Sequence, residues 1–176
     1  EGHAVGSMNK QGGEMATRHL LSLGRTRIAF LGGVSNDSPE FQQRYNGFRQ
    51  ALESTGLPVR EELHIDAENH EASGYNAMLK LLESGETFDA VFAASDLIAI
   101  GAMKCMRKAG IEMPRQVSVV GFDDIPADAY SGPSLTTVRQ DTRIAAKVLV
   151  ENLIAMINGE KVVSCLLPMS LVIRGS

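Results

Sequence analysis

Two adjacent carboxylates, Asp123 and Asp124, follow directly after an unbroken apolar run at residues 117–122. A short run that is rich in β-branched residues and lacks alternation is typical of a parallel strand covered on both faces. In such sheets, ligands bind outside the carboxyl ends of the strands. Asp123 is therefore predicted to face a ligand. The alternative role, forming the turn at the strand end, suits Asp124 better than Asp123.

Three further apolar runs, at residues 28–31, 63–65 and 90–92, also end in polar residues. Because the carboxyl ends of parallel strands meet at one edge of a sheet, these polar residues are predicted to line one crevice with Asp123. Carboxylates and amides accept hydrogen bonds from neighbouring hydroxyl groups, so we expect a hydroxyl-rich ligand there. Arg44, on a predicted helix near the same edge, can donate its N–H groups to such a ligand. The residues that follow the three runs are Asn36, Asp37 and Ser38, then Asp66, Glu68 and Asn69, and then Ser95 and Asp96.

Several of these candidates have a structural alternative. Asp96 and Ser95 can each serve as the N-cap of the helix that follows; this role is favoured for Asp96 and evenly balanced against ligand binding for Ser95. Ser38 is likewise expected to be a helix cap. Arg44 can pair with Glu40 one turn earlier on the helix surface, a contact worth at most roughly 0.5 kcal/mol.

The segments between the apolar runs have the spacing of amphipathic helices, and they predict βαβα alternation. Further runs at residues 135–138 and 166–173 are expected to form two more strands. Right-handed crossovers between parallel strands then give an α/β three-layer sandwich with a mainly parallel sheet. Four of the helices, the first at about residues 12–23, are expected to end on glycines in the left-handed C′ position. These glycines are Gly24, Gly56, Gly85 and Gly110.

A helix capped by Asp141 and running to about residue 158 is predicted to be too apolar to face water. It keeps only one narrow polar stripe. Leaving each large apolar side chain exposed would forgo roughly 1.5 to 3 kcal/mol of burial, so this helix is expected to pack on a partner surface. Its apolar residues are Ile144, Val148, Leu149, Leu153, Met156 and Ile157.

The composition narrows the class of protein. The 176 residues are 44% apolar and carry a formal net charge of −4, which predicts one ordinary globular domain. No stretch concentrates Lys and Arg enough to bind a phosphate backbone, so this chain alone is not expected to bind DNA. Cys105 and Cys165 lack metal spacing and are interpreted as reduced, structural cysteines of a cytoplasmic protein. No apolar stretch approaches the roughly 20 residues that span a bilayer, so no membrane partner is expected.

Motifs typical of enzymes are missing. The sequence contains no GxxxxGK, GxGxxG or GxSxG motif. The four histidines share no spacing, so we predict no cofactor, no metal and no catalysis. A phospho-acceptor role for Asp123 or Asp124 is the enzyme alternative. It fits poorly, because receiver domains and haloacid-dehalogenase-like phosphatases carry their acids near the start of the fold, whereas these acids follow the fourth strand.

Residues 117–141, VSVVGFDDIPADAYSGPSLTTVRQD, resemble the signature of the LacI/GalR family of bacterial transcription regulators. That signature typically reads V-S-V-V-G-F-D-D, a loop, and P-x-L-T-T-V-x-Q-D. The resemblance implies a type I periplasmic-binding-protein-like fold that binds a small effector, often a sugar, in a cleft between two subdomains. In the family, effector binding changes the affinity of a separate N-terminal helix-turn-helix for operator DNA. Other family motifs are matched in order by residues 5–13, 19–33, 44–48, 93–101 and 168–175, so the resemblance spans nearly the whole chain.

The resemblance also implies roles for single residues. Arg44 and Asp123 match effector-contacting positions. Ser95 stands where the family usually has Asn, and Asn69 falls near a position that is often aromatic in sugar-binding members; with Asp37, these residues complete the predicted effector site. A missing aromatic removes a stacking platform for a sugar ring, so a sugar acid held by Arg44 competes with a neutral sugar as the expected effector.

By the same resemblance, the chain is expected to be a fragment, an effector-binding domain over residues 1–176. Residues 6–135 and 162–176 would form a C-terminal subdomain. The helix at 141–158 would belong to an N-terminal subdomain, most of which is expected to precede this sequence together with the DNA-binding head. The bare face of that helix is expected to pack against another copy of the chain in a homodimer. The transport alternative is a periplasmic sugar-binding protein of an ABC transporter with the same fold.

Overall fold

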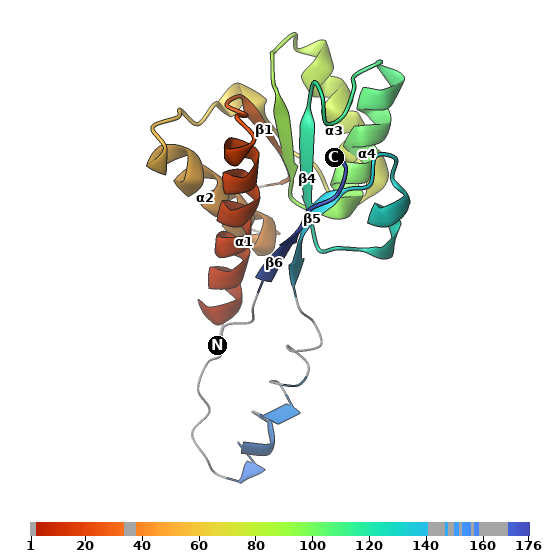
Figure 1. Ribbon diagram of the computed structural model, residues 1–176. Coiled ribbons are helices and arrows are strands. Elements are labelled where there is room, and N and C mark those ends of the chain that lie inside the picture. The colour runs from red at the N-terminus through yellow and green to blue at the C-terminus, as the bar shows by residue number, and fades with distance from the viewer. Residues whose placement is uncertain are drawn as a thin grey trace.

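The computed structural model describes residues 3–33, 38–140, 147, 150–151, 153–155, 157–158 and 169–176, except for the side chains of residues 3–7. A six-stranded sheet in the order β2-β1-β3-β4-β5-β6 forms its centre (Figure 1). Neighbouring strands are parallel except for the last, which runs antiparallel to β5. The mainly parallel sheet is thereby confirmed. The strands are β1 (Ile28–Leu31), β2 (His64–Ile65), β3 (Ala90–Ala93), β4 (Ser118–Phe122), β5 (Thr136–Gln140) and β6 (Met169–Val172).

The central strands bring their polar ends to one edge of the sheet. β1, β3 and β4 are buried along their whole length, as expected of strands covered on both faces. The parallel register pairs Leu31 with both Ile65 and Ala93, and Phe92 with Val120. The residues that follow β1, β2, β3 and β4 therefore emerge together, as the sequence predicted.

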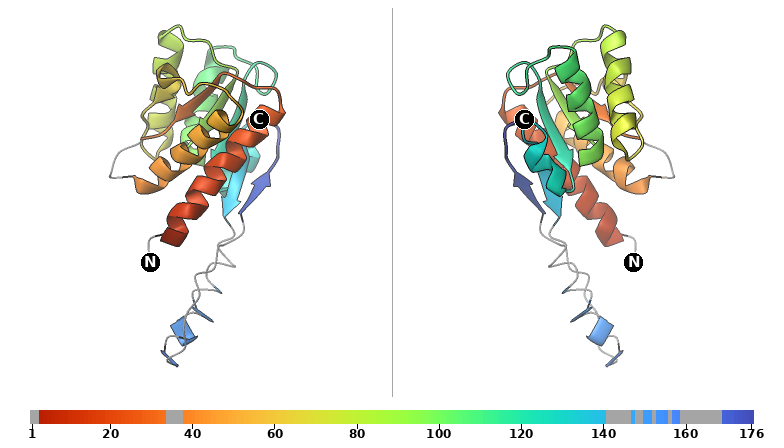
Figure 2. Two further views of the ribbon diagram at one scale, coloured as in Figure 1. Left: turned by 90° about the vertical axis from the view of Figure 1, so that its left-hand side faces the viewer. Right: turned by 90° about the vertical axis from the view of Figure 1, so that its right-hand side faces the viewer.

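Separate helix pairs cover the two faces of this sheet (Figures 1 and 2). α1 (His3–Ser22) and α2 (Pro39–Ser54) lie on one face, and α3 (Glu71–Glu83) and α4 (Asp96–Lys108) lie on the other. The three-layer sandwich is thus confirmed. In the described connections lie two short 3-10 helices, η1 (Glu61–Leu63) and η2 (Pro126–Tyr130). The expected start of the first helix near residue 12 was wrong, because α1 continues through Gly12 and Gly13, where it packs closely on its neighbours.

Glycines allow both helix pairs to approach to backbone contact. A Cβ atom added at Gly13 would lie 2.1 Å from the carbonyl oxygen of Arg44, and one added at Gly47 would lie 2.0 Å from a carbonyl oxygen of α1. Gly74 and Gly101 make the equivalent contacts between α3 and α4. Larger side chains at these positions would force the helices apart. The predicted C′ glycines are also confirmed, since all four adopt φ between 74° and 80°.

A cluster of aromatic rings anchors α2 to the sheet. Phe30 of β1 contacts Tyr45 and Phe48 of α2, with centroid distances of 5.0 and 5.5 Å. His64 of β2 stacks on Tyr45 at 4.6 Å. These contacts set the rotation of α2 about its axis, and Arg44 is thereby directed toward the carboxyl edge of the sheet.

Most of the predicted helix at 141–158 lies outside the described residues, as do Cys165 and Asp37. The described positions between residues 147 and 157 are helical. Val150, Leu153, Ile154 and Ile157 have exposed fractions of 57%, 58%, 54% and 76%, so this stripe of apolar side chains has no cover from the described part of the chain. Among the described residues, no helix is both long and apolar enough to cross a membrane.

Candidate functional site

Arg44 of α2 and Asp123, just after β4, form an ion pair at the carboxyl edge of the sheet. The Arg44 Nη2 donates to Asp123 Oδ1 at 3.3 Å. Its Nε donates to Asn9 Oδ1 at 2.8 Å, and its Nη1 donates to the carbonyl oxygen of Ala94 at 2.6 Å. One guanidinium thus joins α1, α2 and the ends of β3 and β4. This buried contact takes the place of the alternative surface pair with Glu40.

Aromatic rings complete the surroundings of Arg44. Its guanidinium carbon lies 3.7 Å from the ring centroid of Phe122 and 5.6 Å from that of Phe41. Desolvated cation–π contacts of this kind contribute about 2 kcal/mol. Burial lowers the pKa of Arg44, while the Asp123 carboxylate opposes that shift. Because a guanidinium remains charged in proteins, the site contains a cation that Asp123 and the rings already balance.

Asp123 is held in an unusual backbone conformation. Its φ is 116°, in a region that residues with a side chain rarely adopt. Its backbone N–H donates to the carbonyl oxygen of Val138 at 2.9 Å. Burial raises the pKa of Asp123 to about 6, with Arg44 opposing the shift and Asp96 adding to it. The side chain is nevertheless 38% exposed, so a strained acid faces solvent here, and such strain is concentrated at functional sites.

Asp124 has a structural role, as the turn-forming interpretation predicted. Its φ is 58°. Arg174 Nη2 donates to Asp124 Oδ1 at 2.6 Å, and Arg139 Nε donates to Oδ2. Burial alone would raise the pKa of Asp124, but hydrogen bonds from Arg174 and Arg139 lower it. This carboxylate ties the end of β4 to β5 and to the segment after β6.

Ser95 is the N-cap of α4, and the prediction that favoured Asp96 for this role was wrong. The Ser95 Oγ, in a residue only 1% exposed, accepts a bond from the backbone N–H of Ile98 at 3.4 Å. Asp96 is the first residue of α4 and points elsewhere. It accepts a 2.6 Å bond from Thr137 Oγ1 and a 3.1 Å bond from the backbone N–H of Ile125. Thr137 is too far along the chain for any local pattern to predict this contact.

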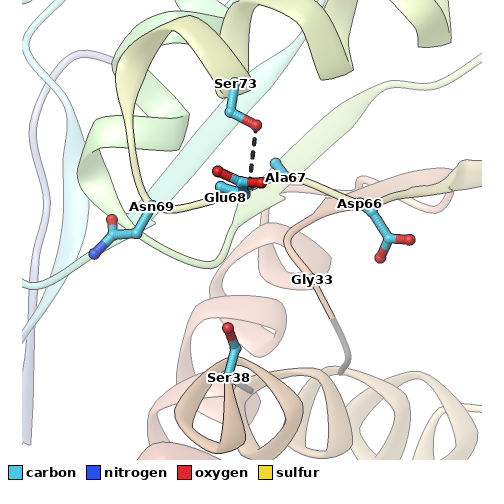
Figure 3. A pocket seen from close by; sticks show the side chains of 7 residues that line it. All are labelled: Gly33, Ser38, Asp66, Ala67, Glu68, Asn69 and Ser73. Atoms are coloured by element: carbon cyan, nitrogen blue, oxygen red, sulfur yellow. Dashed lines mark hydrogen bonds between the residues drawn. The ribbon is translucent and has the colours of Figure 1, made fainter. Parts of the chain in front are cut away.

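A polar pocket of about 490 Å³ lies on the same edge, beyond β1 and β2 (Figure 3). Asp66 and Asn69 point to opposite sides of Glu68, and Ser38 lies across from them at the start of α2. The backbone N–H of Glu68 donates to Ser73 Oγ at 2.9 Å. Ser38 stands at the N-cap position of α2 but makes no side-chain cap bond. The lining residues are Gly33, Ser38, Asp66, Ala67, Glu68, Asn69 and Ser73.

The predicted candidates are therefore not all brought together. Arg44 and Asp123 are in contact. Ser95 directly follows Ala94, whose carbonyl oxygen accepts a hydrogen bond from Arg44. Asn69 lines the polar pocket, whereas Arg44, Asp123 and Ser95 are not among its lining residues. Asp37 lies outside the described residues.

Sequence reasoning missed several residues of this region, among them Asn9, Thr137, Ser73 and Asp128. Ser73 has a local signal, since its backbone N–H donates to His70 Nδ1 at the start of α3, at the end of the polar run that follows β2. Asp128 has no local signal that predicts its complete burial. Within the described part of the chain, no three His, Cys, Asp or Glu side chains are arranged to hold a metal ion.

Comparison with known proteins gives consistent matches. A family model described as a periplasmic binding protein-like domain matches residues 17–176. The HTH-type transcriptional regulator AscG of Escherichia coli K12 is 38% identical over 157 residues, which are 89% of this chain and 46% of AscG. The chain spans about half the length of the curated relatives it matches.

Solved structures agree with these matches. A sugar-binding transcriptional regulator of the LacI family from Escherichia coli, complexed with phosphate, has a TM-score of 0.90 and 35% identity over 96% of this chain and 61% of the other. The complex of the regulator CelR with cellobiose has a TM-score of 0.86 and 34% identity over 96% and 52%. The lac repressor dimer bound to operator and an anti-inducer has a TM-score of 0.87 and 29% identity over 95% and 58%.

Proposed function

Because the chain belongs to the periplasmic-binding-protein-like domain family, in the form found in LacI/GalR-type transcription regulators, we propose that it is the effector-binding core of such a regulator. It binds a small hydroxyl-rich effector and so controls operator binding by a separate N-terminal helix-turn-helix. The observation that carries this proposal is the ion pair of buried Arg44 with strained, partly exposed Asp123 at the carboxyl edge of the sheet.

Asp123 is the central proposed contact. Arg44 occupies Oδ1, which leaves Oδ2 to accept hydrogen bonds from effector hydroxyl groups. Arg44 orients this carboxylate. Ser95 has a buried oxygen that already accepts its cap bond, so it would contact an effector through its O–H donor. Asn69 would contribute from the polar pocket, and Asp37 is proposed from its position in the sequence alone.

Charge favours a neutral sugar over a sugar acid. All three guanidinium nitrogens of Arg44 already donate to protein oxygens, and its charge is balanced by Asp123. The polar pocket adds the carboxylates of Asp66 and Glu68, and its described lining residues include no lysine or arginine. Within the described part of the chain, the ionic contacts of these two carboxylates are with His64 and His70, at 3.8 and 3.3 Å. An anionic effector would therefore meet carboxylates without a permanent cation beside them, whereas the hydroxyl groups of a neutral sugar would find acceptors.

A ligand panel on the full-length protein tests this proposal. Neutral sugars, with cellobiose and ribose as first probes, are compared with gluconate and galacturonate by thermal unfolding and calorimetry. A bound effector at 100 times its Kd contributes about 2.7 kcal/mol, equivalent to a rise in Tm of about 5 °C or more. We expect such a rise with at least one neutral sugar and none with the acids. Stabilisation by gluconate alone would contradict the assignment of a neutral effector, and an unchanged Tm across a broad sugar panel would contradict the function itself.

The rival function is that of a periplasmic sugar-binding protein of an ABC transporter. The relatives reported above are transcription regulators, and this favours regulation over transport. An export signal encoded upstream would support transport, whereas a helix-turn-helix would support regulation. For a regulator that meets operator DNA we propose a cytoplasmic location and no catalysis. Incorporation of phosphate at Asp123 or Asp124 from a phospho-donor would contradict the absence of catalysis.

The exposed apolar stripe on the 147–157 segment supports a proposal about assembly. Its members stand at spacings of three and four residues and so share one helix face. We propose that residues 141–158 belong to the second subdomain of the complete regulator. In the chain by itself, the stripe is covered by a second copy in a homodimer. The lac repressor structure, which is a dimer, is consistent with such pairing. The stripe consists of Val150, Leu153, Ile154 and Ile157.

A further inference from the structure

Asp128 of η2 is a buried acid without an apparent hydrogen-bond donor. It is fully buried, and neither of its carboxyl oxygens accepts a hydrogen bond from any described residue. An ionised carboxylate in this position would lose its hydration without compensation, which costs several kcal/mol. A protonated carboxyl group would instead carry one O–H donor and need only an acceptor.

Asp96 is the acceptor that the local contacts favour, because both acids are tied to Ile125. The backbone N–H of Ile125 donates to Asp96 Oδ2 at 3.1 Å, and the backbone N–H of Asp128 donates to the carbonyl oxygen of Ile125 at 3.1 Å. Asp96 also adds to the raised pKa of Asp128. Asp96 is also fully buried, but it already has two donors, Thr137 Oγ1 and the backbone N–H of Ile125. It lies in the first turn of α4, where the helix dipole stabilises negative charge. Because each carboxylate oxygen has two lone pairs, Asp96 can accept a third bond.

The other charged groups around Asp128 do not replace this arrangement. Arg174 Nη1 is 3.9 Å from Asp128 Oδ2, but that nitrogen donates to the carbonyl oxygen of Leu135 at 2.8 Å. Its Nη2 is bound to Asp124. Burial raises the pKa of Asp128 to about 8; Asp96 and Asp124 add to the shift, and Arg174 opposes it.

We propose that Asp128 is a positioning residue that keeps its proton at neutral pH and donates a hydrogen bond from its O–H group to the carboxylate of Asp96. The resulting carboxyl–carboxylate bridge joins η2 to the start of α4. The same Asp96 holds Ile125 and Thr137, so the bridge fixes the segment between β4 and β5 whose first residue is Asp123. The inference rests on the proposed function only for the part that Asp123 plays in effector binding.

The first test compares the wild-type chain with Asp128→Asn, whose amide can donate permanently to Asp96. The folded wild type holds the proton to about pH 8, whereas an unfolded aspartate loses it near pH 4. The folded state therefore binds more protons in that window, and its stability falls as the pH rises through it. Asn does not titrate, so the Asp128→Asn variant should have a Tm about 4 °C or more above wild type at pH 8, with the difference shrinking toward pH 5.

An ionised Asp128 paired with Arg174 predicts the opposite result. The Asn variant would then lose a charge partner and melt below wild type at neutral pH, and this result would overturn the inference. Glu62→Gln is the matched control. It removes an exposed carboxylate whose partner is Arg60, and its Tm should stay within about 1 °C of wild type at each pH.

A second measurement uses the wild type and needs no ligand. The side-chain carboxyl carbon of Asp128, followed by NMR, should titrate near pH 8, and the amide of Ile125 should shift with the same midpoint. A midpoint below 5 would overturn the inference. In the Asp128→Asn variant, the pH-dependent shift of the Ile125 amide near pH 8 should disappear. If this shift persisted, a group other than Asp128 would be titrating, and the inference would be overturned.

The positioning role is then measured with the neutral sugar that binds best in the panel. Asp128→Ala removes the bridge and should weaken binding about tenfold, the equivalent of one hydrogen bond, whereas Asp128→Asn should retain near wild-type affinity. Equal affinity of the Ala variant and wild type would reject the positioning role. If no sugar binds the wild type, the proposed function fails, while the stability and NMR measurements still decide whether the bridge exists.

Discussion

At the residue scale, Asp123 and Asp124 show how position separates two identical side chains. Both have positive φ at the end of β4. Asp123 is partly buried beside one guanidinium; burial raises its pKa to about 6, although Arg44 opposes the shift. Two guanidinium groups, by contrast, lower the pKa of Asp124. Neighbouring carboxyl groups with pKa values shifted in opposite directions have different tasks. Asp123 is the ligand candidate, and Asp124 is the structural anchor.

Substitution of each acid by asparagine should separate these tasks. Asp123→Asn should weaken effector binding by roughly ten- to a hundredfold, because it loses charge-assisted hydrogen bonds worth about 1.5 to 3 kcal/mol, and it should leave Tm almost unchanged. Asp124→Asn is the matched control. It removes the negative charge and turns one acceptor oxygen into a donor amide, so at least one of the bonds from Arg139 and Arg174 is lost. It should therefore lower Tm while affecting affinity less. Calorimetry and thermal unfolding of the full-length variants measure both effects. Unchanged affinity of Asp123→Asn would remove Asp123 from the site.

The affinity should also depend on pH through Asp123. The ionised carboxylate accepts effector hydroxyl groups, so binding should weaken as the pH falls below about 6, where Asp123 becomes protonated. Isothermal titration calorimetry between about pH 5 and 8 measures this dependence, because a group with a pKa near 6 changes its protonation state within that range. Asp123→Asn should bind weakly at every pH in this range.

At the scale of elements, the close packing of α1 on α2 places Arg44. Gly13 packs against the backbone carbonyl of Arg44 itself, so the distance between the two helices fixes the position of the Arg44 backbone and, with it, that of the guanidinium. The aromatic cluster around Phe30 and Tyr45 fixes the other side of α2. The sequence contains these glycines within its family-like motifs, but only the packing explains them: a side chain there would meet backbone, which cannot rotate away.

Gly13→Ala should therefore destabilise the protein even though alanine favours helix by about 1 kcal/mol. Its Cβ would lie 2.1 Å from a carbonyl oxygen, and overpacking of this kind costs about 1 to 3 kcal/mol. Effector affinity should fall as well, because α2 and Arg44 are displaced. Denaturant unfolding and calorimetry measure the two losses. Gly132→Ala is the control, since a Cβ there meets nothing within 4 Å; a Gly13→Ala variant as stable as this control would show that the helices can separate freely.

At the scale of the whole molecule, the sandwich is complete while one apolar stripe remains uncovered. Four large side chains between residues 150 and 157 are more than half exposed. Each forgoes roughly 1.5 to 3 kcal/mol of burial, a cost that a partner surface would remove.

The chain by itself should therefore self-associate through this stripe. Light scattering combined with size exclusion should give a dimer mass for wild type, and Leu153→Lys or Ile157→Lys should shift it to monomer. Glu151→Lys, which reverses an exposed charge on the same segment, should remain dimeric apart from a small electrostatic effect. A monodisperse wild-type monomer with this helix well ordered would contradict the proposal.

Much of the fold could be predicted because its signals are local. The strand at 28–31 was predicted with the bounds that β1 has, and the four C′ glycines adopt the predicted φ. Periodicity, caps and turn glycines act between residues within a turn or two of each other. The shared edge of strand ends then follows from the chirality of parallel crossovers. Arg44 and Asp123 were predicted as site residues from that edge and from the resemblance to a family.

The contacts of single side chains were decided only by tertiary structure. Local rules favoured Asp96 over Ser95 as the cap, and the choice was reversed by Thr137, which follows Asp96 by 41 residues. Asp128 carries no sequence signal, because its complete burial and the shift of its pKa depend on groups far along the chain, such as Asp96 of α4 and Arg174 after β6. Backbone preferences are properties of neighbouring residues, so the sequence by itself determines them. Burial, charge balance and hydrogen-bond partners depend on groups that meet only when the sheet is assembled.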